Sequence, residues 1–208
     1  MSFIRTAAPD EAVGEVAAMY LRQQSAWGYV PNYARVFSHR PEVLARWAQL
    51  LAEIRRPMDS RRFELATFAA AHELRNSACT LAHGNRLREF LSDEDIAALA
   101  AGRGVATLTQ AEQAMVRFAR QLARDASKVT TSQISELKAL GFTDAEVFDI
   151  AAVAAGRAFF AKLLDALGVA PDSPFLALDA TLLQALTVGR PIDTRPCVTM
   201  QANTGAPV

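Results

Sequence analysis

Three side chains suited to redox or nucleophilic chemistry lie close together near the middle of the chain: Glu64, Cys79 and His83. Cys79 is one of only two cysteines, and His83 is one of only three histidines, among 208 residues. A thiol, an imidazole and a carboxylate are the components of a thiol-based active site. Because Cys79 and His83 are four positions apart, an α-helix would place them on one face, about one turn apart.

A polar segment just before Cys79 predicts where its helix begins. Asn76 and Ser77 both favour the N-cap position, and they follow an apolar run. With Asn76 as the cap, Cys79 would be the third helical residue, where the helix dipole and unpaired N–H groups favour a thiolate. A protonated His83 would act in the same direction. We therefore predict a nucleophilic sulfur with a pKa below the usual value of ~8.5.

The spacing of these residues resembles the AhpD-like alkylhydroperoxidase core of the carboxymuconolactone decarboxylase superfamily. That motif is a glutamate, a Cys-x-x-Cys and a histidine four residues after the second cysteine. Cys79 matches the second, peroxide-attacking cysteine, and Glu64 and His83 match the proton-relay acid and histidine. Asn76 stands in place of the first, resolving cysteine, and Ala78 in place of a further relay histidine of some members. The single cysteine is similar to the "peroxidase-related" branch.

The resemblance extends over most of residues 3–192, including residues 28–33, 40–42, 114–124 and 163–169. It implies an all-α helical bundle that assembles as a homo-oligomer, and it implies neither a metal nor a cofactor.

The activity that the resemblance implies is a peroxidase-like oxidoreductase acting on a hydroperoxide or another small molecule. Cys79 would be the nucleophile, His83 its activating base and Glu64 the relay acid. Without the first cysteine, no disulfide cycle operates within this motif, so an external thiol would reduce the sulfenic acid that forms on Cys79.

Two other functions remain open. A lactone decarboxylase or isomerase-like enzyme would use His83 and Glu64 for proton transfer, with the sulfur incidental. A non-catalytic oligomeric scaffold would use neither, because Cys79 could simply be a small buried hydrophobic residue.

Cys197 and His72 are weaker candidates for the site. Cys197 is the only other thiol, and we interpret it as an inert residue of the C-terminal segment rather than a resolving partner. His72 lies eight residues after Glu64, about two turns along the same helix face. It could join the relay or form a metal site with Glu64, Cys79 and His83, but the spacing matches no specific metal motif.

Composition narrows the class of protein. Hydrophobic residues make up 51% of the chain, and the 22 basic and 22 acidic residues cancel, which gives no indication of a nucleic-acid partner. Charged residues interrupt the most apolar stretch, residues 147–169, and argue against a membrane span. The start of the sequence lacks the apolar core of a signal peptide. Two distant cysteines are not a disulfide framework, so we expect a cytoplasmic protein.

Helix caps and apolar spacing predict the elements that position the site. We expect one helical domain over residues 1–188 and a flexible or partner-wrapped tail over residues 189–208, where Pro, Thr, Gly and Asn dominate. The expected helices are residues 9–24, 41–54, 60–74, 77–90, 93–101, 110–124, 131–140, 144–167 and 175–186. Residues 25–40 are expected to be an aromatic loop.

Overall fold

The computed structural model describes residues 2–200, and within that range the chain forms ten α-helices and four short 3₁₀ helices. The α-helices are α1 (Gly14–Trp27), α2 (Asn32–Val36), α3 (Pro41–Arg55), α4 (Ser60–Glu73), α5 (Ser77–Leu87), α6 (Asp93–Ala100), α7 (Gln110–Asp125), α8 (Thr131–Ala139), α9 (Asp144–Ala166) and α10 (Ala180–Leu186). An isolated bridge between Val30 and Val198 is the only β pairing in this range. The prediction of an all-α fold is confirmed.

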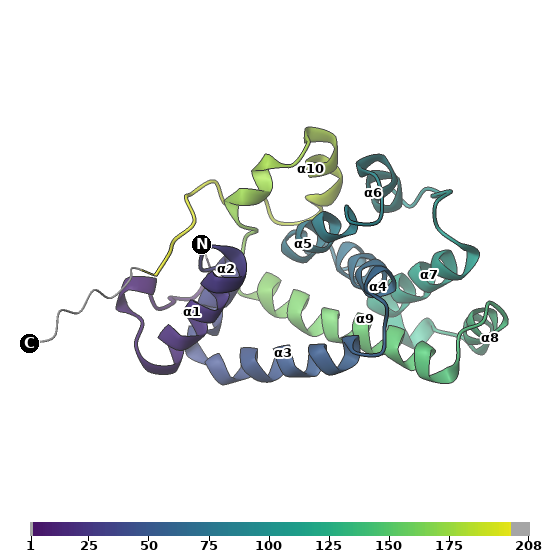
Figure 1. The fold of residues 1–208 in the computed structure, drawn as a ribbon, viewed down its shortest axis with the longest axis horizontal. Helices are drawn as coiled ribbons and strands as arrows, with labels where there is room; N and C mark the ends of the chain where they lie inside the picture. The colour runs from purple at the N-terminus through teal and green to yellow at the C-terminus, as the bar shows by residue number, and fades with distance from the viewer. Residues whose placement is uncertain (1, 201–208) are drawn as a thin grey trace, which may run out of the picture.

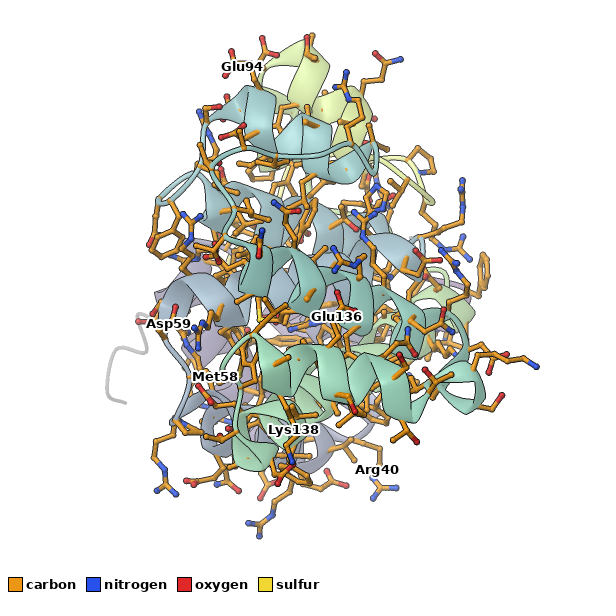
Figure 2. The ribbon with its side chains drawn as sticks, turned by 90° about the vertical axis from the view of Figure 1, so that its right-hand side faces the viewer. Arg40, Met58, Asp59, Glu94, Glu136 and Lys138 are labelled. Carbon is orange, nitrogen blue, oxygen red and sulfur yellow. The ribbon has the colours of Figure 1, made fainter. Side chains whose placement is uncertain are left out.

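Helix α4 lies at the centre of the bundle (Figure 1) and packs against α5, α7 and α9. Helix α3 runs beside α9, α1 and α2 close one end, and α10 packs against α5 and α6. Charged side chains such as Glu94, Glu136 and Lys138 are exposed on the outside of the bundle (Figure 2). Within residues 2–200, no helix is long and apolar enough to cross a membrane.

The composition of α4 explains its central place. Every residue from position 63 to 71 is buried, so the helix is covered on all sides rather than along one apolar stripe. Alanines at positions 66 and 69–71 keep the helix thin, which lets three neighbouring helices approach it closely. The buried Glu64 in this run is therefore an exception that needs a partner.

The predicted helix starts are confirmed at the caps. Asp59 begins α4 by accepting the backbone N–H of Arg62, and Asn76 begins α5 by accepting that of Cys79. Capping boxes begin α7, α8 and α9 at Thr109, Thr130 and Thr143. These caps satisfy backbone donors that would otherwise lack partners, which is why short polar motifs predict them well.

Three expected elements differ from the structure. The first helix is divided, because extended residues at positions 12 and 13 separate a 3₁₀ turn from α1. The expected aromatic loop contains α2. The last helix is also divided, because Leu178 is extended and Asp179 caps a new start, accepting the backbone N–H groups of Thr181 and Leu182.

The first part of the predicted tail packs against the helical domain. The backbone N–H of Gly189 donates to Oγ of Ser77 at 2.8 Å, and that of Val30 donates to the carbonyl of Val198 at 2.8 Å. A Cβ at Gly189 would lie 2.0 Å from the carbonyl oxygen of Arg75, so this approach requires glycine. Residues 189–200 thus differ from the expected tail, because backbone contacts that composition does not encode hold them. Residues 201–208 lie outside the described range.

Two buried hydrophobic clusters meet near α4. The larger one joins α4 to α7, α9 and α10, and the smaller one joins α1, α2 and α3 to the second half of α9. Cys79 belongs to the smaller cluster, whereas Phe63 and Leu81 belong to the larger one. The candidate site therefore lies where the two clusters adjoin.

Candidate active site

The junction between α4 and α5 places Cys79 in the first turn of its helix, as predicted. Arg75 adopts a left-handed conformation with φ of 58°, and Asn76 then caps α5. Oδ1 of Asn76 accepts the backbone N–H of Cys79 at 2.8 Å, and its Nδ2 donates to the carbonyl of Ala161 at 3.3 Å. Asn76 therefore serves as a buried cap that links α5 to α9.

Glu64 and His83 come together across the α4–α5 interface. Nδ1 of His83 lies 2.6 Å from Oε2 of Glu64. Burial raises the pKa of Glu64, but the hydrogen bond with His83 and the nearby positive charges of Arg55 and Arg157 outweigh it, so the pKa is lowered. Because an ionised carboxylate only accepts, Nδ1 of His83 donates the hydrogen.

The hydrogen bond to Glu64 fixes the tautomer of His83. Burial, followed by the charge of Arg157, lowers the pKa of His83, although Glu64 opposes this shift. The neutral ring carries its proton on Nδ1, which leaves Nε2 free to accept one. The pair thus has the arrangement of an oriented general base.

The sulfur of Cys79 bonds to a residue outside the predicted set. The side chain is 3% exposed, and Nη1 of Arg157 donates to Sγ at 3.5 Å. Within residues 2–200, the sulfur makes no hydrogen bond to His83. The structure therefore brings Glu64 and His83 into direct contact and places Cys79 one turn away, against α9.

The predicted low pKa of Cys79 is not what its surroundings favour. Burial raises the pKa of the thiol, while the charge and hydrogen bond of Arg157 lower it and Asp165 raises it further. The expectation rested on unpaired N–H groups at the helix start, but Asn76 occupies the N–H of Cys79 itself. Desolvation disfavours the thiolate form of Cys79, and Arg157 is the main group that favours it.

Arg157 is the residue of this cluster that the sequence interpretation missed. It is 5% exposed in the middle of α9, and its Nε is buried without a hydrogen-bond partner. Its guanidinium carbon lies 5.6 Å from the ring centroid of Phe160. The sequence did contain an indication of this residue, because Arg157 lies within the most apolar stretch of the chain. An arginine is rarely buried unless it is paired.

Aromatic rings surround the Arg157 side of the site. Phe160 stacks on Phe37 and on Trp47, with centroid distances of 5.9 and 5.6 Å, and meets the edge of Tyr33. Burial raises the pKa of Tyr33 to about 12, so this phenol is neutral. The predicted aromatic loop therefore contributes Tyr33 and Phe37 to the region around the site.

The two weaker candidates lie away from this cluster. Burial and the charge of Arg120 lower the pKa of His72 to about 4, and its ring packs on Phe68 at 5.9 Å. Sγ of Cys197 lies 3.5 Å from Oγ of Ser173, and both cysteines are free thiols. In the part of the chain that the structure describes, no three His, Cys, Asp or Glu side chains are grouped to hold a metal ion.

Comparison with known proteins identifies the fold. The chain is similar to the alkylhydroperoxidase AhpD core, uncharacterized peroxidase-related protein from Ralstonia eutropha JMP134, with a TM-score of 0.74 and 21% identity over 85% of this chain and 95% of that one. An uncharacterized peroxidase-related protein from Silicibacter sp. TM1040 has a TM-score of 0.68 and 20% identity, over 82% and 91% of the two chains. The fold is thus that of AhpD-core proteins.

A debrominase has the same fold as these uncharacterized peroxidase-related proteins. The debrominase Bmp8, in a cysteine-to-alanine variant in complex with 2,3,4-tribromopyrrole, has a TM-score of 0.63 and 14% identity over 83% of this chain and 89% of that one. The sequence matches no known protein-family model and no curated protein. The fold therefore does not by itself select one reaction.

Proposed function

We propose that the protein is a thiol-dependent oxidoreductase that reduces hydroperoxides through Cys79, with His83 as the base and Glu64 as the relay acid. The observation that carries the proposal is the combination of a buried cysteine bonded to a buried arginine with an adjacent Glu64–His83 pair. A hydrophobic structural cysteine needs neither a cation nor an oriented base. The resemblance of the motif and the fold of the peroxidase-related neighbours support the same chemistry.

The reaction follows from these three side chains. His83 takes the proton of the Cys79 thiol, and the thiolate attacks the terminal oxygen of the hydroperoxide. An S–O bond forms as the O–O bond breaks, and the departing alkoxide takes the proton from His83. Cys79 becomes a sulfenic acid and the hydroperoxide becomes an alcohol. Glu64 keeps His83 oriented and stabilises the imidazolium between the two proton transfers.

Reduction of the sulfenic acid needs a second thiol. Two molecules of an external thiol would return Cys79 to the thiol, giving one disulfide and one water. Cys197 bonds to Ser173, and position 76 holds an asparagine, so an external reductant suits this chain better than an internal disulfide. A reducing compartment such as the cytoplasm would supply it.

Exposed apolar side chains support the predicted homo-oligomer. Phe148, Phe159 and Leu50 are 71%, 48% and 54% exposed along α9 and α3. Large apolar side chains gathered on neighbouring helices are typical of a subunit interface. We propose that this face pairs with a second copy of the chain.

The second candidate function is proton transfer without sulfur chemistry, as in a decarboxylase or isomerase. Burial of the thiol, which raises the pKa of Cys79, favours it, as does the neutral His83 beside an ionised Glu64. In such an enzyme the oriented imidazole removes a proton from a carbon acid, and Cys79 contributes only to packing.

Peroxide consumption in the presence of excess dithiothreitol separates these functions. We expect hydrogen peroxide or cumene hydroperoxide to be consumed by the wild-type chain and by Cys197→Ser. The Cys79→Ser variant should lose the activity. Equal peroxide consumption by wild-type and Cys79→Ser chains would remove the peroxidase from consideration, and the proton-transfer enzyme or a scaffold would remain.

A further inference from the structure

Arg157 touches the reacting sulfur but has no part in the proton transfers described above. Arginine side chains are not deprotonated in proteins, and the side chain of Arg157 is 5% exposed. Burying such a charge is costly unless an anion or several acceptors satisfy it. A buried arginine at this position therefore indicates a negatively charged group with which it interacts.

The surroundings of Arg157 offer few such groups. In the described part of the chain it forms no ion pair with a carboxylate, and it donates a hydrogen bond to Sγ of Cys79 at 3.5 Å. Its charge acts at longer range on Glu64 and His83, whose partners are each other. Among these groups, the Cys79 sulfur is the one that can become an anion in direct contact with the guanidinium.

Neighbouring residues hold the guanidinium in place. Phe160 lies beneath it, and Trp47 stacks on Phe160. A Cβ at Gly156 would lie 3.1 Å from the Trp47 ring, so the residue before Arg157 leaves room for that ring. A cation on an aromatic face loses little further freedom when it forms hydrogen bonds.

One donor of this group is unused. Nε of Arg157 is buried and has no partner, which is uncommon for a buried polar atom. Nε belongs to the same rigid plane as Nη1, so it lies at a fixed short distance from Nη1, the atom that contacts the sulfur. An oxygen atom bound beside the sulfur would give it the acceptor that it lacks.

We propose that Arg157 is a catalytic residue that holds Cys79 as a thiolate through Nη1 and donates Nε–H to an oxygen of the bound hydroperoxide. This inference rests on the proposed peroxidase function. During the step, negative charge passes from sulfur to the departing oxygen as the S–O bond forms and the O–O bond breaks. Arg157 keeps its protons throughout and stabilises both charges, while the departing oxygen takes its proton from His83.

Two variants separate the charge of Arg157 from its donor geometry. Arg157→Met keeps a long apolar side chain and removes both, and Arg157→Lys keeps the charge but lacks the planar set of donors. Lys162→Met removes an exposed cation from the same helix and is the matched control. Each is made with Cys197→Ser, so that Cys79 is the only thiol, and circular dichroism establishes that each variant is folded.

The first readout is the thiolate titration of Cys79 by ultraviolet absorbance, with Cys79→Ser as the blank. We expect Arg157→Met to raise the pKa of Cys79 enough to lower the thiolate fraction about tenfold or more, and Arg157→Lys to give a smaller change. Lys162→Met should titrate as the parent protein does. An unchanged titration in Arg157→Met would overturn the proposal, whether or not the protein reduces peroxides.

The second readout is the rate constant of sulfenic acid formation, divided by the thiolate fraction. It should fall about tenfold or more in both Arg157→Met and Arg157→Lys, because neither side chain presents Nε–H. A full corrected rate in Arg157→Lys would overturn the donor role. Absence of a sulfenic acid in the parent protein would instead contradict the proposed peroxidase, and the titration would still decide whether Arg157 stabilises the thiolate.

Discussion

The stability of the folded protein should depend on pH through Asp172, and one isosteric substitution should remove that dependence. The carboxyl group is 8% exposed, and Oδ1 accepts the backbone N–H of Asn32 at 2.8 Å. Burial raises its pKa from 3.8 to about 6, the Asn32 hydrogen bond opposes this, Asp193 adds to it and Arg35 opposes it. The folded state therefore holds the protonated form more strongly than the unfolded chain does.

The sign and the size of the effect follow from linkage. The contribution of Asp172 to the free energy of unfolding is fully present below pH ~4 and is lost as the pH rises through about 6. The loss occurs because the carboxyl group ionises at a lower pH in the unfolded chain than in the folded protein. A difference between 3.8 and about 6, at about 1.4 kcal/mol per pKa unit, gives about 3 kcal/mol at pH 7. Asp172→Asn keeps the acceptor oxygen and removes the charge, so it should stabilise the protein by up to about 3 kcal/mol at neutral pH.

Urea denaturation followed by circular dichroism between pH 4 and 7.5 measures this difference at a fixed protein concentration. The advantage of Asp172→Asn over the wild type should grow across the interval from pH ~4 to ~6 and then become constant. Asp10→Asn, at an exposed aspartate, should show no such increase. A difference that is constant with pH, or a variant less stable than the wild type at pH 7, would show that Asp172 is not held protonated by burial.

Three further substitutions test the geometry of the site. Asn76→Ala should destabilise the chain by about 1 kcal/mol in urea denaturation because it removes the α5 cap, and Asn76→Ser should restore most of the loss. Gly84→Ala should cost about 1–3 kcal/mol, since its Cβ would lie 2.6 Å from Cδ1 of Leu186; Leu186→Ala in the same chain should relieve part of the clash. Glu64→Gln should slow peroxide consumption about tenfold or more, because an amide does not stabilise protonated His83. A full rate in Glu64→Gln would remove Glu64 from the mechanism.

The local part of the site could be predicted from sequence because it depends on short-range patterns. Asn76 as a cap, Cys79 in the first turn and the capping box at Thr143 all follow from side chains that bond to backbone within three residues. The approach of Glu64 to His83 was also expected, but on resemblance rather than on spacing. In the structure, their 2.6 Å contact joins two consecutive helices, and residues 74–76, with Arg75 in a left-handed conformation, connect them.

The features of the site and fold that could not be predicted depend on contacts between segments far apart in the sequence. Arg157 reaches Cys79 across 78 positions, and no periodicity within α9 specifies that contact. Gly189 meets Ser77 across 112 positions, so a polar segment that composition assigns to a tail packs against the start of α5. The pKa of Cys79 was predicted in the wrong direction for the same reason, because burial is a property of the assembled helices.

The most direct test of the proposed function is mass spectrometry of Cys79 after the Cys197→Ser protein is exposed to hydrogen peroxide with dimedone. We expect a dimedone adduct on Cys79 that forms more slowly in His83→Ala and is absent without peroxide. Reduction by dithiothreitol before dimedone is added should abolish it. A Cys79 that stays unmodified in a folded protein under these conditions would contradict the account of this residue as the peroxide-reducing thiol.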